Sequence, residues 1–156
     1  MKLKPNRPLK TKKDTISKRS RARQLAMQGV YQWLITGYDF ATIETQLHDE
    51  PGFKRADFDF FTRLLEGSLE NRANLESAIC SHLDRPLTEI SPIERAILIV
   101  AAFELVHSLD VPFQVVINEA IELAKKFGGT DGHKYVNAVL NEQARQSRAI
   151  EIAHTN

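Results

Sequence analysis

The chain has 156 residues, 42% of them hydrophobic and 26% charged, a composition typical of one ordinary globular domain. No apolar run approaches the roughly 20 residues that a membrane span needs, and a single cysteine excludes an internal disulfide, so we expect a cytoplasmic protein. The net charge of +1 conceals a division, because residues 1–23 hold ten Lys or Arg and one acid, which leaves 11 basic and 19 acidic residues in the remainder. This asymmetry favours either a polyanion bound at one end and a basic partner at the other, or a solvated tail beside an ordinary body.

The N-terminal stretch changes character at about residue 17. Residues 1–16 contain two prolines and many lysines with little to bury, which predicts a disordered basic arm. Ser17 or Asp14 is then placed to cap a helix that runs to about Thr36. Arg19 and Arg23 lie four positions apart and are predicted on one solvent-facing side, with Arg21 near it. Such a helix can present guanidinium groups to phosphates, but a merely solvated face remains an alternative.

The next segment is predicted to hold a short and a long helix. A short helix over about 40–47 precedes a Pro51-Gly52 turn, and Asp57 can cap a long helix that ends near Leu83. Cys80, which has no local His partner, is expected to be a small buried hydrophobe. The predicted buried stripe of the long helix is Phe58, Phe61, Leu64, Leu65, Leu69, Leu75 and Ile79.

A strong helix start follows at Ser91-Pro92-Ile93-Glu94, which combines an N-cap serine, a proline and a capping-box glutamate. Residues 96–103 are apolar on nearly every side, so this helix should be central in the fold. Glu94 is interpreted first as a capping residue and second as a contact for a partner.

Residues 111–141 read as two amphipathic helices joined at Gly128-Gly129, which we expect to take the left-handed conformation. Thr130 or Asp131 is predicted to cap the second helix. Free amides at that helix start attract anions. Tyr135 can either pack there or stack on an unpaired base.

These elements predict an all-α fold, a compact bundle of about seven helices in two connected subdomains. The expected boundaries are an arm at 1–16, an N-terminal half at 17–84, a C-terminal half at 85–148 and a tail at 149–156. Enzyme signatures are missing, because no nucleophile, metal-ligand or phosphate-loop pattern is present. We therefore expect no enzyme activity, no catalytic residue, no metal and no cofactor.

Several motifs, in order, carry a resemblance to the NusB family of bacterial antitermination factors. The specific one is VPFQVVINEAIELAKKFGGTDGHKYVNAVLN, over 111–141. Others are R-x-R-A-R-x-x-A from Arg19 to Ala26, Y-x-W at Tyr31 and Trp33, F-x-x-L-L-x-G from Phe61 to Gly67, and E-x-A-I-L-x-x-A-x-x-E-L from Glu94 to Leu105. The resemblance covers about residues 17–145.

The resemblance implies a two-subdomain helical fold and a protein that binds boxA RNA of ribosomal RNA transcripts together with NusE, a small-subunit ribosomal protein. It also implies a place beside NusA and NusG on RNA polymerase, without a membrane. Glu94 and Arg95 would face NusE. A second group from the later helix pair would lie near the start of the first helix and complete the RNA surface. The RNA-binding residues implied are Lys18, Arg19, Arg21, Arg23, Asp131, Lys134 and Tyr135.

Three departures from the family pattern qualify this expectation. Ser20 interrupts a run of arginines, which removes one phosphate contact, and Tyr135 stands where phenylalanine is common. The arm at 1–16 is longer than usual, and we expect it to add salt-sensitive affinity for RNA. Two alternatives stay open: an RNA-binding domain related to those of ribosomal RNA cytosine methyltransferases, whose catalytic domain is missing here, and a generic helical interaction domain.

Overall fold

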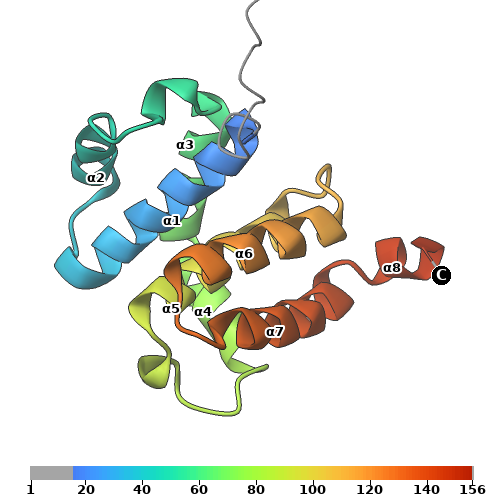
Figure 1. The fold of residues 1–156 in the computed structure, drawn as a ribbon. Helices are drawn as coiled ribbons and strands as arrows, with labels where there is room; N and C mark the ends of the chain where they lie inside the picture. Colours follow the sequence, from blue (N-terminus) through green and yellow to red (C-terminus); the bar gives the residue numbers. More distant parts are fainter. Residues whose placement is uncertain (1–15, 156) are drawn as a thin grey trace, which may run out of the picture.

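The computed structural model describes residues 16–155, and within that range it is all-helical, as predicted (Figure 1). The predicted arm at 1–16 therefore lies outside the described residues, except for Ile16. The elements in chain order are α1 (Lys18–Thr36), α2 (Phe40–Leu47), the 3-10 helix η1 (Phe53–Arg55), α3 (Phe58–Glu70), α4 (Arg72–Cys80), the 3-10 helix η2 (Leu87–Glu89), α5 (Pro92–His107), α6 (Phe113–Phe127), α7 (Gly132–Ser147) and α8 (Ala149–Thr155).

Helix α5 is the centre of the molecule. Every residue from Ala96 to Leu105 is buried, which confirms the central helix expected from its continuous apolar sequence. It packs against α1, α3 and α4 on one side and against α6 and α7 on the other. The division into halves at 17–84 and 85–148 stays a prediction, because α5 contacts helices from both.

Two glycines let helices approach closely around this centre. A Cβ on Gly29 of α1 would lie 2.6 Å from Cδ1 of Leu65 in α3, and one on Gly67 of α3 would lie 2.3 Å from the ring of Phe103 in α5. Such distances are shorter than any atomic contact in a packed core. The α1–α3 and α3–α5 crossings therefore depend on glycine at these positions.

The predicted helix starts are confirmed where a polar side chain caps them. Ser17 accepts a hydrogen bond from the N–H of Ser20 (2.9 Å), and Asp57 accepts one from Phe60 (3.0 Å). At α5, the Ser91 side chain accepts from the N–H of Glu94 (3.2 Å) and its hydroxyl donates to the Glu94 carboxylate. These caps satisfy amides that the helix itself leaves without a partner.

The single long helix predicted from Asp57 to Leu83 is wrong, because the chain breaks at Asn71 into α3 and α4. The Asn71 side chain donates to the carbonyl of Gly67 (2.8 Å), a local hydrogen bond of the kind that competes with helix continuation. Two burial predictions in this stretch are also wrong. Phe58 is 47% exposed at the first position of α3, and Cys80 is exposed at the end of α4.

The turn between α6 and α7 differs from the prediction. Gly128 has φ −86° and ψ −178°, and the positive φ angles within 16–155 belong to Gly37 and Gly52. Asp131 makes no side-chain cap on α7. Glycine is needed here for its size, since a Cβ on Gly132 would collide with the Glu94 carboxylate and one on Gly128 would lie 2.7 Å from a carbonyl oxygen of α6.

Residues 149–155, predicted only as a tail, form α8, and Arg148 before it is buried. The Arg148 guanidinium donates to four carbonyl oxygens at the end of α5 and in the turn after it, those of Glu104 (3.1 Å), Leu105 (2.8 Å), Ser108 (2.9 Å) and Val111 (2.8 Å). It also pairs with Glu151 (2.6 Å), whose carboxylate accepts from the N–H of Phe113 (2.8 Å). One side chain thus closes the end of α5 and joins it to α8. None of the helices described over 16–155 has the length and apolarity to cross a membrane.

Candidate nucleic-acid interface

The start of α1 carries the first group of predicted RNA-binding residues. Lys18 and Arg19 are exposed, and Arg21 is half-buried. The backbone N–H of Asp57 donates to the carbonyl of Lys18 (3.0 Å), which ties the start of α3 to the start of α1. The Asp57 carboxylate also lies 3.8 Å from Nε of Arg19. Two helix starts are therefore held together at one corner of the molecule (Figure 1).

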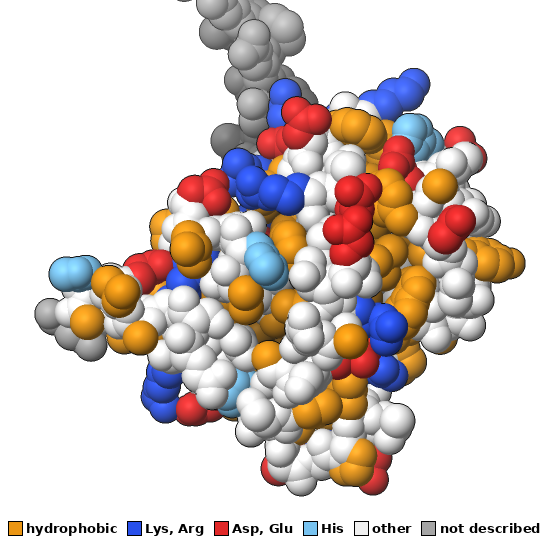
Figure 2. Space-filling view, turned by 180° about the vertical axis from the view of Figure 1, so that it is seen from behind, with side chains coloured by type: hydrophobic (Ala, Val, Ile, Leu, Met, Phe, Trp, Pro, Cys, Tyr) orange, Lys and Arg blue, Asp and Glu red, His pale blue; other side chains and the backbone are white. Residues whose placement is uncertain are grey.

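A phenylalanine orders the cations at this corner. The guanidinium of Arg19 lies 4.3 Å from the centre of the Phe60 ring, and that of Arg63 lies 5.1 Å from it. Both arginines are exposed, whereas Phe60 is buried, and the buried guanidinium of Arg23 also lies 5.0 Å from the ring centre. The ring thus contacts two exposed cations and one buried cation. Figure 2 shows Lys and Arg side chains along the upper edge of the molecule, where the start of α1 lies. Sequence reasoning missed Arg63, because only the fold brings α3 beside α1.

Arg23 is not on this surface, and the prediction that it faces solvent is wrong. Only 4% of Arg23 is exposed, and its guanidinium makes two hydrogen bonds to the buried Glu104 of α5, at 2.7 and 3.0 Å. Its Nη1 also lies 3.6 Å from Oε1 of Glu119 in α6. The four-residue spacing from Arg19 does not put both on one exposed side, because α5 and α6 cover the side of α1 that Arg23 occupies.

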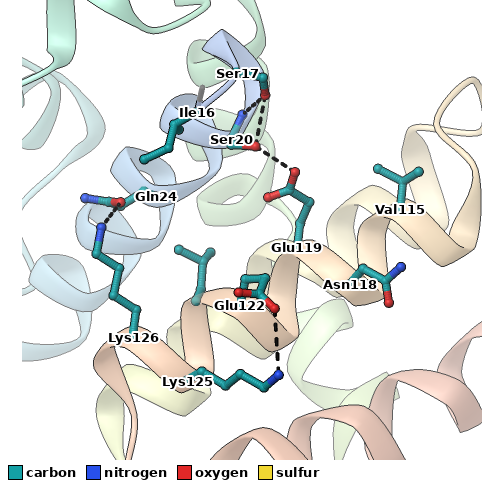
Figure 3. A pocket seen from close by; sticks show the side chains of 11 residues that line it. Ile16, Ser17, Ser20, Gln24, Val115, Asn118, Glu119, Glu122, Lys125 and Lys126 are labelled. Atoms are coloured by element: carbon teal, nitrogen blue, oxygen red, sulfur yellow. Dashed lines mark hydrogen bonds and ion pairs between the residues drawn. The ribbon is translucent and has the colours of Figure 1, made fainter. Parts of the chain in front are cut away.

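Ser20 joins α1 to α6 at the edge of a groove. Its hydroxyl donates to Oε1 of Glu119 (2.6 Å), and it interacts with Ser17 at 2.9 Å (Figure 3). The groove, of about 870 Å³, lies between the start of α1 and the outer side of α6. Farther along it, Lys126 donates to the side chain of Gln24 (3.3 Å), while Lys125 lies 3.8 Å from Glu122. The residue that interrupts the arginine run thus fixes the position of α1 on α6.

The start of α7 carries the second predicted group. Asp131 and Lys134 are exposed and lie 3.4 Å apart. Tyr135 is half-buried, and the guanidinium of Arg85 lies 4.9 Å from the centre of its ring. Arg85 in turn pairs with Asp84 at 3.0 Å. The Arg85 guanidinium lies over one side of the Tyr135 ring, where an unpaired base would otherwise stack. Arg85 therefore belongs to this group of residues. The sequence analysis did not identify it.

The phenol of Tyr135 is held in its neutral form. Burial raises the pKa of Tyr135 above its ordinary value, and the nearby Asp84 carboxylate raises it further. The hydroxyl is buried, and the Asp84 carboxylate lies near it. Tyr135 therefore presents an uncharged ring whose hydroxyl is covered, suited to packing and stacking rather than to phosphate contact.

The two groups lie on different sides of α6 (Figure 1). Figure 1 shows the start of α1 on one side of α6 and the start of α7 on the other. Ser20 contacts the middle of α6 at Glu119, whereas α7 begins just after α6 ends at Phe127. Eight residues of helix separate these points, about 12 Å at 1.5 Å per residue. Lys126, which contacts α1 from the last turn of α6, lies between them.

The predicted partner contacts, Glu94 and Arg95, each have a role inside the fold. The Glu94 carboxylate accepts a hydrogen bond from the hydroxyl of the cap residue Ser91 and fits against Gly132 at the start of α7. Nη2 of Arg95 donates to Glu76 of α4 (3.1 Å). Both side chains are half-buried, so they position α4, α5 and α7 relative to one another.

This arrangement suits binding rather than bond making. It offers exposed cations on helix starts and a half-buried aromatic ring, which are the groups that contact phosphates and bases. In the described part of the chain, no three His, Cys, Asp or Glu side chains gather closely enough to hold a metal ion.

Comparison with known proteins gives a consistent picture. A model of the NusB family matches residues 20–145. The chain is 52% identical over 148 residues to the transcription antitermination protein NusB of Ralstonia nicotianae, covering 95% of this chain and 96% of that protein. It is also 52% identical to the protein of that name from Thiobacillus denitrificans, over 85% of this chain and 92% of the other.

Solved structures agree with the fold. NusB of T. maritima matches with a TM-score of 0.73 and 31% identity, over 81% of this chain and 90% of that one. A NusB chain crystallised with NusE and double-stranded RNA matches with a TM-score of 0.76 and 22% identity, over 83% and 97%. The helical arrangement described above is thus similar to that of these structures.

Proposed function

This chain belongs to the NusB family, and we propose that it is a transcription antitermination factor that binds boxA RNA of ribosomal RNA transcripts together with NusE. It acts in the cytoplasm on RNA polymerase, beside NusA and NusG, and catalyses no reaction. The observation that carries this proposal is the start of α1, where exposed Lys18 and Arg19 stand beside Arg21 and Arg63 on a fixed pair of helix starts. A cationic surface held by the fold contacts phosphates with less loss of side-chain freedom than a flexible tail.

The proposed RNA path runs from the start of α1 to the start of α7. Lys126 lies between the two groups, and at the far end Asp131 and Lys134 stand at the edge of the surface. Arg85, whose guanidinium lies 4.9 Å from the centre of the Tyr135 ring, offers a flat cation on which a base can stack. Arg23 is left out of the contact set, because its guanidinium is buried against Glu104. Its proposed role is to hold α1 in place.

NusE is proposed to approach the side of α5 that carries Glu94 and Arg95. The acidic balance of the chain beyond residue 23 supports attraction to a basic ribosomal protein. Glu94 and Arg95 already have partners inside the fold. Each is therefore proposed to affect NusE binding in two ways, by direct contact and by holding the neighbouring helices in place.

The proposal predicts a salt-dependent loss of RNA affinity in the double variant Lys18→Gln/Arg19→Gln. Each phosphate contact to a single strand contributes about 0.7 to the slope of log affinity against log salt, so losing two lowers the slope by about 1.4. The measurement is fluorescence anisotropy with a boxA-like strand and a scrambled strand, with and without NusE, at several salt concentrations. Arg145→Gln is the matched control, since Arg145 is an exposed arginine on the last turn of α7.

A preference for the boxA strand that NusE sharpens, and that the double variant weakens, supports the antitermination role. Equal and strongly salt-dependent binding to both strands would show a general attraction to polyanions. In that case the generic helical interaction domain would replace the proposal.

A further inference from the structure

The corner formed by α2, η1 and α3 carries aromatic side chains at the edge of the core, two of which are exposed. His48 stacks on Phe53 with ring centres 4.3 Å apart, and Phe58 lies edge-on to both, at 6.2 and 6.0 Å. Phe61, which is fully buried, supports the group from beneath at 5.6 Å from Phe53. We call His48, Phe53 and Phe58 the aromatic corner. Phe58 is 47% exposed and the His48 side chain 48%, so the corner offers ring surface to solvent.

The fold fixes this corner beside the start of α1. The Asp57–Lys18 backbone hydrogen bond joins the residue before Phe58 to α1. In the turn before η1, Gly52 has φ +86°, and a Cβ placed there would lie 3.0 Å from Nη1 of Arg21. A glycine is therefore required for its conformation, and it lets the turn lie against α1. Figure 1 shows η1 and the start of α3 beside the start of α1.

Charge connects the aromatic corner with the surface on α1. Lys54 and Arg55 are exposed on η1, and Arg63 is exposed on α3. The carboxylate of Glu44 lies 3.3 Å from Nε2 of His48, and residues 44–63 hold five acids (Glu44, Asp49, Glu50, Asp57, Asp59), so their own balance is −2. Adding Lys18, Arg19 and Arg21 makes the combined balance +1. The surface around the aromatic corner therefore has a positive charge balance only when the cations at the start of α1 are included. This favours a polyanion that is already bound at the start of α1.

We propose that the aromatic corner is a second RNA-binding site, which stacks unpaired bases of single-stranded RNA flanking the strand held at the start of α1. Phe58 and His48 supply the stacking surfaces, and Lys54 and Arg55 contact the neighbouring phosphates. Stacking on aromatic rings accepts any base, so this site extends affinity without adding sequence preference. The inference rests on the proposed function, because the corner gains its positive charge from α1.

The test uses the full chain and three RNA probes: a short boxA-like strand, and the same strand extended by about six uridines at one end or the other, within the range of known single-strand sites. One extended probe is expected to bind more tightly than the short one. Phe58→Leu keeps an apolar side chain but removes the aromatic ring, and should weaken the extended probe about five- to tenfold while leaving the short probe unchanged. Tyr38→Leu is the matched control, because Tyr38 is also 47% exposed and lies beyond the opposite end of α1.

Two further measurements make the result independent of any loss of stability in Phe58→Leu. The surface variant Lys54→Gln/Arg55→Gln should lower the salt dependence of the extended probe alone. Ultraviolet crosslinking of the uridine extension, read by mass spectrometry, should attach RNA to the peptide that contains Phe58 and not to the one that contains Tyr38.

The outcomes separate this inference from the proposed function. If neither extension strengthens binding, or if Phe58→Leu retains the gain, the aromatic corner is not an RNA site, although the short probe can still prefer boxA. If Phe58→Leu weakens NusE binding and leaves both RNAs unchanged, the corner is a protein contact and the inference is wrong. If the short probe shows no preference for boxA, the proposed function itself fails.

Discussion

Replacement of Arg23 by alanine is expected to lower the free energy of unfolding by about 3–5 kcal/mol, the usual result of breaking a buried ion pair by removing one partner. The Glu104 carboxylate, 2% exposed, would lose both hydrogen bonds from the guanidinium and remain buried without a countercharge. For a domain of this size the loss corresponds to a fall in the melting temperature of about 6–20 °C. Urea unfolding followed by circular dichroism measures it.

The matched control is Arg19→Ala, one turn earlier on the same helix. Arg19 also lies over the Phe60 ring, but it is 45% exposed and its contact with Asp57 is long, so its loss should change stability by at most about 1 kcal/mol. The two variants should therefore behave oppositely: Arg19→Ala weakens RNA binding at nearly full stability, and Arg23→Ala loses stability while the folded fraction still binds RNA. Equal stability of the two would contradict the role assigned to Arg23.

A double variant separates the charge from the packing. Arg23→Met/Glu104→Leu replaces the buried pair with apolar side chains of similar size, a change that is often neutral or stabilising. We expect it to be more stable than Arg23→Ala and to retain RNA affinity. If the double variant folds well but binds no RNA, Arg23 has a contact role that its burial does not suggest.

Replacement of Arg148 by alanine is expected to lower the free energy of unfolding by about 2–5 kcal/mol, because buried carbonyl oxygens that accept from its guanidinium would lose that hydrogen bond, at roughly 1–3 kcal/mol for each group left without a partner. The carbonyl oxygens of Leu105 and Val111 would lose their Arg148 donor, and those of Glu104 and Ser108 would keep only a backbone N–H donor. Helix α8 would also lose its link to α5. Arg145→Ala is the control, because Arg145 lies three residues earlier, is exposed and pairs only with Glu142. It should stay within about 0.5 kcal/mol of the parent chain. Near-equal stability of the two variants would disprove the capping role.

The Arg148 network also predicts a dependence on pH. Burial alone would raise the pKa of Glu151, but hydrogen bonds from the Phe113 N–H and from Arg148 outweigh it and hold that pKa below its ordinary value. A carboxyl whose pKa is lower in the folded chain adds stability above its unfolded pKa, about 4.3, and loses it as the pH falls through the folded value. The stability difference between the parent chain and Glu151→Gln should thus be largest near pH 7 and shrink below about pH 4. A constant difference would show that the charge is not the cause.

Patterns among residues close in the sequence predicted the helices of this fold better than the residues of its RNA surface. Ser17, Asp57 and Ser91 were identifiable as caps because each acts on an amide only three residues away. The central position of α5 followed from its apolar sequence alone. The break at Asn71 was missed, because a polar residue inside a long amphipathic pattern gives no sign of whether its side chain will bond the preceding turn.

The RNA surface was harder to predict, since it depends on contacts between distant segments. An arginine run shows where cations are but not which of them is turned inward, and the partner that buries Arg23 lies 81 positions away. Arg63 and Arg85 gain meaning only when Phe60 and Tyr135 are seen beside them. The periodicity that placed Phe58 in the core failed, because Phe58 lies at the first position of α3, where it contacts Phe53 and His48 at the surface.

The distance in sequence between Arg23 and Glu104 has a consequence for how the protein is made. Ribosomes add about 5–20 residues per second, so Glu104 is synthesised about 4–16 s after Arg23. During this interval the apolar side of α1 has no α5 to cover it, and the guanidinium that will be buried stays hydrated. The surfaces of α1, α3 and α4 that pack against α5 in the finished fold have no partner during this interval. A growing chain of this protein thus presents uncovered apolar helix surface until α5 emerges.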